Sequence, residues 1–256
     1  MKRFCFTVDD NIRCLKEITE RGYGSIFEHP YLSMYRRLHG RFGLKVQLNL
    51  FYETEGFDLT QMTDRHQAEW QSNSDWLRLS FHSKLGNARP YEHSGYEEVF
   101  ADCQNVHREI VRFASKEALG KTTTVHYCRA TNEGIQALKD NGVKGLLGLY
   151  GDEKTPRSSY QTTEEHCERI RDGEVIVCDK MAYAGIDIVL NIYPIEEILL
   201  QLSGLIGRNL IKVMIHEQYF YPDYHAYQKE FEGKLEKTFG YLMENGYRSS
   251  FFEECL

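Results

Sequence analysis

Short apolar runs alternate with longer segments of helical periodicity along most of the chain, and this alternation constrains the fold more than any other feature. The runs that we expect to form strands are Arg3–Val8, Val46–Phe51, Leu77–Phe81, Thr122–Val125, Lys144–Leu149, Ile186–Leu190 and Leu210–Ile215. The segments that we expect to form helices are Pro30–Gly40, Thr60–Ser72, Tyr96–Ser115, Asn132–Asn141, Pro194–Ser203 and Tyr224–Asn245. Because alternating strands and helices usually form βα units, the sequence predicts an α/β fold with a mainly parallel sheet.

The chain shows no sign of a domain boundary. Gly151–Asp179 is polar and irregular, and we expect a loop region there with a hairpin at Asp172–Gly173. No Pro/Ser-rich linker, low-complexity tract or repeat divides the 256 residues. Since α/β barrels of about 250 residues commonly form one domain, we expect a single domain over residues 1–256.

Charge and cysteine usage exclude several classes of partner and compartment. The formal charge of −7 argues against a nucleic-acid partner, because binding to phosphates requires a concentrated basic face. The N-terminal MKRFCFTVDD is too short in apolar residues for a signal peptide, and no later stretch approaches a membrane span. The seven cysteines are scattered without a CxxC pair, as is typical of free thiols in a reducing compartment. The sequence therefore predicts a cytoplasmic protein with no nucleic-acid or membrane partner.

Carboxylates and imidazoles stand directly after four of the expected strands. These residues are Asp9, Asp10, His82, His126, His216 and Glu217. In an α/β barrel the loops after the strands meet at one face, so these side chains are expected to converge. Such a group suits a divalent metal flanked by an acid and a base. Taken singly, each residue has a structural explanation, since paired aspartates cap loops and a lone histidine usually packs.

Four short motifs resemble those of the polysaccharide deacetylase (NodB-like, carbohydrate esterase) family, in the same order. Thr7–Asn11 resembles T-F-D-D-G, and Ser80–Ser83 resembles the start of H-S/T-x-x-H. His126–Thr131 occupies the place of R-P-P-Y-G, and Ile215–Glu217 resembles L-H-D. The resemblance implies a distorted (β/α)7 barrel of the glycoside hydrolase/deacetylase type.

The resemblance also implies an activity and a set of roles. The reaction would be metal-dependent removal of an acetyl group from an N-acetylated or O-acetylated sugar, with zinc as the expected divalent metal. Asp9 would be the catalytic base and His216 the catalytic acid, while Asp10 and His82 would be metal ligands. The expected partner is a carbohydrate or a sugar-derived small molecule.

The sequence departs from the family at the third metal ligand. Four residues after His82 stands Gly86, where the family has a second histidine. We hypothesise that His126 supplies the third ligand, with His93 as the reserve candidate, because a neighbouring strand end reaches the centre more reliably than a loop. A degenerate metal site is the alternative.

Substrate contacts and competing functions complete the expectations. Arg129, Tyr150 and Tyr219 are the expected substrate-binding residues, since aromatic faces stack on sugar rings and polar groups bind hydroxyls. One alternative is a glycoside hydrolase that pairs Asp9 or Asp10 with Glu217. Another is a non-catalytic barrel that binds a saccharide or a protein partner.

Overall fold

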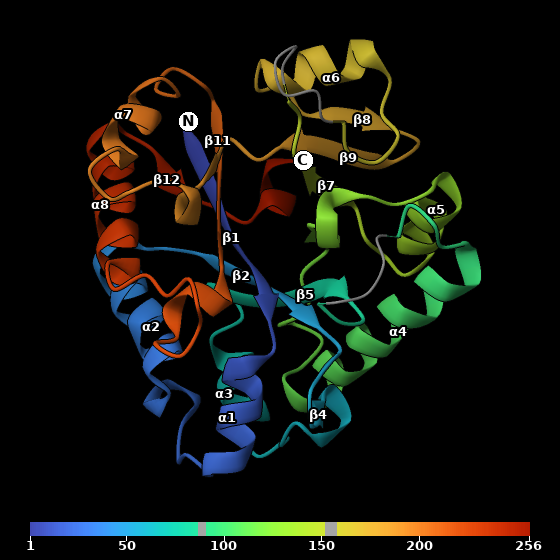
Figure 1. The fold of residues 1–256 in the computed structure, drawn as a ribbon, viewed down its shortest axis with the longest axis vertical. Coiled ribbons are helices and arrows are strands. Elements are labelled where there is room, and N and C mark those ends of the chain that lie inside the picture. Colours follow the sequence, from blue (N-terminus) through green and yellow to red (C-terminus); the bar gives the residue numbers. More distant parts are fainter. Residues whose placement is uncertain (87–90, 152–157) are drawn as a thin grey trace.

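Parallel strands form the centre of the molecule and helices cover them on the outside (Figure 1). The computed structural model describes residues 1–86, 91–151 and 158–256. Its strands are β1 (Arg3–Asn11), β2 (Val46–Phe51), β3 (Glu53–Thr54), β4 (Phe57–Asp58), β5 (Leu77–Ser83), β6 (Thr122–Thr123), β7 (Gly145–Gly148), β8 (Ile176–Cys178), β9 (Met181–Gly185), β10 (Ile188–Val189), β11 (Leu210–His216) and β12 (Arg248–Ser249). Its α-helices are α1 (Arg13–Arg21), α2 (Pro30–Phe42), α3 (Gln67–Ser72), α4 (Tyr96–Phe113), α5 (Asn132–Asp140), α6 (Glu164–Arg171), α7 (Ile198–Ser203) and α8 (Phe231–Glu244).

Apart from the two-stranded β3-β4 sheet, the strands form two sheets that are joined at both ends into a distorted barrel. One sheet has the order β10-β11-β1-β2-β5, and the other has the order β6-β7-β9-β8. At the first junction, the amides of Leu79 and Gly120 bond to the carbonyls of Ala118 and Leu79, each at 2.8 Å. At the second junction, the chain passes directly from β9 to β10, and Ile186 N donates to Gly148 O at 2.8 Å.

The parallel pairing of the strands around the barrel confirms the expected fold class. The neighbours β11, β1, β2 and β5 are parallel, as are β6, β7 and β9, and β10 is parallel to β11. If β9 and β10 are taken as one bent strand, the wall of the barrel has seven parallel strands among the described residues. The antiparallel β8 lies outside the wall of the barrel, at the edge of the second sheet. The chain is therefore a distorted (β/α)7 barrel.

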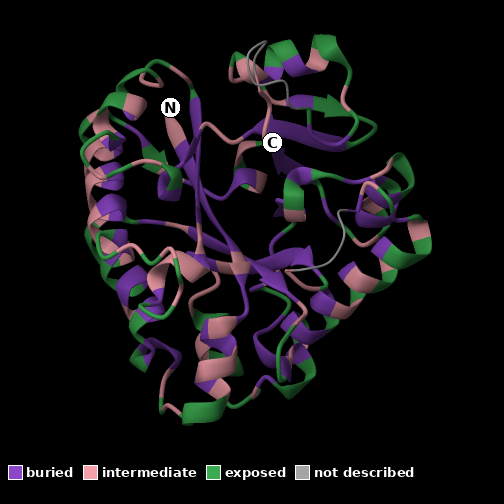
Figure 2. Cartoon of the chain, viewed as in Figure 1, coloured by how far each residue is buried: buried purple, intermediate pink, exposed green. Residues whose placement is uncertain are grey.

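The core lies between the strands and the inner faces of the helices, as the buried residues in Figure 2 show. Helix α4 illustrates why the sequence folds in this way. Its apolar residues recur every three or four positions and therefore share one face. All of them are fully buried, and they are Val99, Cys103, Val106, Ile110 and Phe113. Among the described residues, no helix is both long and apolar enough to cross a bilayer.

Some expected elements were wrong, each for a local reason. The helix expected at Thr60–Ser72 is instead a short 3-10 turn capped by Asp58, followed by the six-residue α3. Residues 152–157 of the expected loop lie outside the described part of the chain, and the segment after Thr163 contains α6 and β8 rather than an irregular loop. Asp172–Gly173 ends α6, and the hairpin turn lies at Asp179–Lys180, where both residues have a positive φ without the usual glycine.

A buried histidine in α4 should make the stability of the fold sensitive to acid. Burial lowers the pKa of His107 from 6.5 to about 4. The unfolded chain therefore takes up this proton first as the pH falls, and stability is lost between pH 6.5 and about 4. We expect the free energy of unfolding of the unchanged protein to fall by about 3 kcal/mol over this pH range. The variant His107→Gln cannot take up the proton and should not show this loss. Urea unfolding across this pH range measures the difference.

The matched control for this measurement is His225→Gln, because His225 is exposed. Its pH dependence should follow that of the unchanged protein. Parallel curves for His107→Gln and the unchanged protein would contradict the assignment.

Candidate metal centre

Asp9 and Asp10 lie at the C-terminal end of β1, where the strand is irregular. In a regular strand, neighbouring side chains point to opposite faces and do not share one site. Here the register against β2 shifts between Val8 and Asn11, and Asp10 has a left-handed backbone with φ of 64°. Aspartate tolerates this conformation better than most residues with a side chain. As a result, both carboxylates lie close enough to His82 to raise its pKa.

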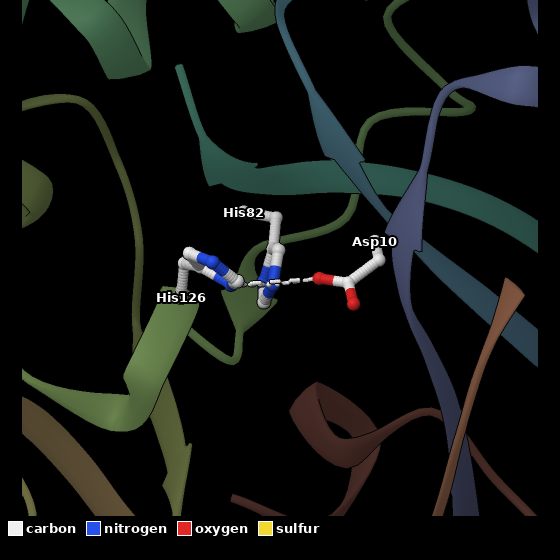
Figure 3. A group of neighbouring side chains, drawn as sticks. All are labelled: Asp10, His82 and His126. Carbon is white, nitrogen blue, oxygen red and sulfur yellow. Dashed lines mark hydrogen bonds and ion pairs between the residues drawn. The ribbon is translucent and has the colours of Figure 1, made fainter. Parts of the chain in front are cut away.

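Three side chains from different strand ends meet beside β1 (Figure 3). They are Asp10 of β1, His82 of β5 and His126, which begins the turn after β6. His82 Nε2 lies 3.0 Å from Asp10 Oδ1 and 3.1 Å from His126 Nδ1, and the last two atoms are 3.4 Å apart. Ligand atoms in a tetrahedral zinc site, with bonds near 2.0–2.1 Å, are roughly 3.3 Å apart. The separations therefore match those of a metal site.

Hydrogen bonds on the far side of each imidazole determine which nitrogen is free. His82 Nδ1 faces the carbonyl oxygen of Thr124, and His126 Nε2 lies 2.9 Å from the carbonyl oxygen of Gly86. Because a carbonyl only accepts, those nitrogens carry the hydrogens in the neutral rings. The lone pairs of the other two nitrogens then face each other and Asp10, an arrangement that repels unless a cation or an extra proton lies between them. This donor set fits a divalent metal.

The ionisation of the group reflects competition between burial and charge. Burial opposes the charged form of Asp10, but hydrogen bonds from the protonated forms of His126 and His82 hold the pKa of Asp10 well below its usual range. Burial likewise opposes protonation of His82, yet the negative charges of Asp9 and Asp10 raise the pKa of His82 above 6.5. The site therefore attracts positive charge, either as protons or as a metal ion.

Asp9 stands beside the three potential ligands and is held by β2. Asn49 Nδ2 donates to Asp9 Oδ1 at 2.7 Å, and Gln47 Nε2 donates to Asn49 Oδ1 at 2.8 Å. Burial raises the pKa of Asp9, against the opposing charges of His82 and His216. A carboxylate with a raised pKa is suited to accept a proton. Sequence reasoning missed Asn49 and Gln47, although polar residues at alternate positions of a buried strand are a readable signal.

His216 ends β11 and pairs in register with Asp9. Its Nδ1 lies 2.8 Å from Oδ1 of Asn191, in the turn after β10. The amide oxygen accepts, so His216 carries a hydrogen on Nδ1 and its Nε2 is available for chemistry. A neutral side chain, rather than a carboxylate, thus orients this imidazole. Asn191 was also missed, because its contact with His216 joins two separate turns.

Neither a family model nor a curated protein sequence matches the chain, but solved structures do. A peptidoglycan N-acetylglucosamine deacetylase matches with a TM-score of 0.52 and 10% identity, over 98% of this chain and 86% of the other. A family 4 acetyl xylan esterase from Clostridium thermocellum, in complex with a cobalt ion, matches with 0.50 and 13% identity, over 99% and 89%. A 4-alpha-glucanotransferase from Thermococcus litoralis matches with 0.60 and 13% identity, over 99% of this chain and 40% of the other.

This chain has the deacetylase barrel fold. The resemblance seen in the sequence motifs is thereby confirmed at the level of the fold. At 10–13% sequence identity, this likeness concerns the fold and not the individual residues of the site.

Gly86 stands where the family motif has a metal-binding histidine, and it cannot supply a side-chain ligand. A Cβ at Gly86 would lie 3.3 Å from the ring of Phe51, so a larger side chain is crowded there. Phe51 also packs on His82 and His126, with ring centroids 5.1 and 5.0 Å away. Gly86 instead contributes its carbonyl oxygen, which orients His126. The reserve candidate His93 is exposed beside Glu92 and does not join this group.

Glu217 lies outside the metal-ligand group and caps α1. Its carboxylate accepts from the backbone amides of Ile12, Arg13 and Cys14 at 2.8, 3.0 and 2.8 Å. The side chain therefore points to the N-terminus of this helix. The cap also explains why the sequence did not reveal α1, since its capping residue comes from more than 200 positions away.

Removal of this cap should destabilise the barrel. In Glu217→Ala, several buried amides lose their acceptor, and we expect the free energy of unfolding to fall by about 2–4 kcal/mol. Glu217→Gln keeps one acceptor oxygen and should lose less. Urea unfolding measures both, with Glu236→Ala as the control, because the side chain of Glu236 is 44% exposed and forms a surface ion pair with Arg41. A loss below about 1 kcal/mol in Glu217→Ala would refute this role.

An open cavity of about 620 Å³ gives access to the metal-ligand group. Its lining includes Asp10, Phe51, His126, Gln218 and Tyr224. The ring of Tyr219 packs edge to face on Tyr224, at 5.3 Å between centroids, and lies 6.1 Å from the ring of His216. Tyr219 therefore lies beside His216 and beside one residue of the cavity lining, and its role as a substrate contact remains a prediction.

The two other expected substrate contacts lie differently. Arg129 forms an ion pair with Glu92, close to the turn that carries His126. Tyr150 lines a separate cavity of about 330 Å³ together with Arg171 and Arg208. The structure thus does not bring Tyr150 to the metal-ligand group, contrary to expectation.

Proposed function

We propose that this protein is a metal-dependent hydrolase that removes an acetyl group from an N-acetylated or O-acetylated sugar, with zinc as the preferred ion. The observation that carries the proposal is the convergence of Asp10 Oδ1, His82 Nε2 and His126 Nδ1 within 3.4 Å of one another. These three ligands leave coordination positions open for water and substrate, as catalytic zinc sites do. The barrel fold shared with sugar deacetylases supports the same class of substrate.

The residues around the three ligands suit the two proton transfers of deacetylation. A bound divalent metal would polarise the acetyl carbonyl and acidify water. Asp9, which bonds Asn49 and lies outside the group of three potential ligands, would take a proton from the attacking water. His216, held by Asn191 on the other side of β1, would give a proton to the leaving amine or alcohol.

The glycoside hydrolase alternative pairs Asp9 or Asp10 with Glu217, and the position of Glu217 does not suit that role. That reaction requires two carboxyl groups on opposite sides of the scissile bond. Asp9 and Asp10 come from one strand end and lie on the same side, both close to His82. Glu217 is 1% exposed and bonded to the N-terminus of α1, so it cannot face them across a substrate.

Metal-dependent acetate release tests the proposal. Protein stripped with a chelator and reloaded with Zn²⁺ or Co²⁺ is incubated with N-acetylglucosamine oligomers and with acetylated xylan. We expect acetate release that requires the added metal. A protein that binds the metal and the saccharide but releases no acetate would instead be the non-catalytic barrel, and the proposal would fail.

A further inference from the structure

The two carboxylate oxygens of Asp10 face different partners. Oδ1 lies near His82 Nε2 and His126 Nδ1, at 3.0 and 3.4 Å. Oδ2 accepts a hydrogen bond of 2.8 Å from Nε2 of Gln218, in the turn after β11. One oxygen is thus left for a metal, and the other is already engaged.

The chemistry of Asp10 determines the orientation of the Gln218 amide. Gln218 Nε2 donates to Asp10 Oδ2 at 2.8 Å, and an ionised carboxylate, the form that holds a metal, only accepts. The amide must therefore present its nitrogen to Asp10. In that orientation Gln218 Oε1 is buried, and no group in residues 1–86, 91–151 or 158–256 donates to it. An unpaired buried acceptor is destabilising, a cost that a purely structural glutamine would avoid.

The main chain around Gln218 is fixed on both sides. The preceding Glu217 is anchored to the backbone amides of α1, and Tyr221 N donates to Gln218 O at 3.2 Å. The side chain therefore extends from a rigid turn to its one partner. A donor placed in this way can control the geometry of a ligand rather than simply fill space.

We propose that Gln218 is a positioning residue that restricts Asp10 to coordination of the metal through Oδ1 alone. Because the hydrogen bond occupies Oδ2, the carboxylate cannot turn to bind through both oxygens. One more coordination position then stays open for water and substrate. This inference rests on the proposed function, since it concerns the same metal centre, but it assigns a role to a residue outside the ligand set.

Cobalt binding to Gln218→Met tests the role. Methionine fills a similar volume without a donor, and Co²⁺ reports coordination number through its visible absorption. We expect the Co²⁺ affinity, measured by competition with a chelator, to fall about 10–100-fold. We also expect weaker visible absorption, because binding through both oxygens of Asp10 raises the coordination number. Loss of stability alone would not produce that spectral change.

Two comparisons make the result decisive. Gln136→Met changes an exposed glutamine of α5 in the same way and should leave affinity and spectrum unchanged. Thermal unfolding of the metal-free Gln218→Met protein establishes that it is folded. Unchanged Co²⁺ affinity and spectrum in this variant would overturn the positioning role and leave the metal centre standing. Failure of the unchanged protein to bind Co²⁺ would overturn both the positioning role and the proposed function.

Discussion

Replacing Asp9 with asparagine is expected to slow acetyl release by about 10²–10⁴-fold while the metal stays bound. The variant removes the group that would accept a proton from water. It leaves Asp10, His82 and His126 in place, and an asparagine oxygen can still accept the bond from Asn49. Since burial raises the pKa of Asp9, the carboxylate is itself unfavourable in the fold, and its loss should not lower the melting temperature.

Measurement of kcat and of metal content on the same sample separates loss of the catalytic base from loss of the metal. Asp75→Asn makes the same chemical change at an exposed position and should leave both quantities unchanged. If Asp9→Asn loses activity together with the metal, Asp9 is a ligand and not the base. If its activity is unchanged, another group removes the proton.

Replacing His126 with glutamine is expected to weaken Zn²⁺ binding by at least about a hundredfold. Loss of a residue that only orients a ligand already costs 10–100-fold, and loss of the ligand itself should cost no less. His126 is the departure from the family pattern, so this variant tests the least expected member of the site. The dissociation constant is measured by competition with a chromophoric chelator.

His93→Gln is the matched control for this substitution. His93 was the other candidate for the third ligand, and it is exposed beside Glu92. We expect Zn²⁺ affinity in this variant equal to that of the unchanged protein. The reverse result, with loss in His93→Gln alone, would move the site to a different part of the surface.

The grouping of Asp10, His82 and His126 could be predicted because it depends on features that a sequence records well. Each residue directly follows a run of buried residues, and ends of parallel strands meet at one face of a barrel. With Gly86 in place of the histidine of the family motif, the next strand end, which carries His126, is the nearest source of a third ligand. Their function as ligands remains a prediction that the variants above test.

The contacts made by the neighbours of these residues could not be predicted. Glu217, Gln218 and Asn191 act on groups far away in the sequence, and their side-chain directions depend on the turns that carry them. The same reason explains the missed α1, whose cap comes from Glu217. Local patterns thus locate the strand ends, whereas the hydrogen bonds among them depend on the folded chain.

The origin of the ligands in two different sheets has a mechanical consequence. Asp10 and His82 belong to the sheet of β1, β2 and β5, whereas His126 follows β6 of the other sheet. Where these sheets meet, some of the bonds are between side chains and backbone, such as Ser80 Oγ to Thr122 O at 2.7 Å. A metal held by all three residues would link the two sheets across this junction. Its removal would then loosen the wall of the barrel as well as end the chemistry, so that catalytic competence and closure of the fold depend on the same ion.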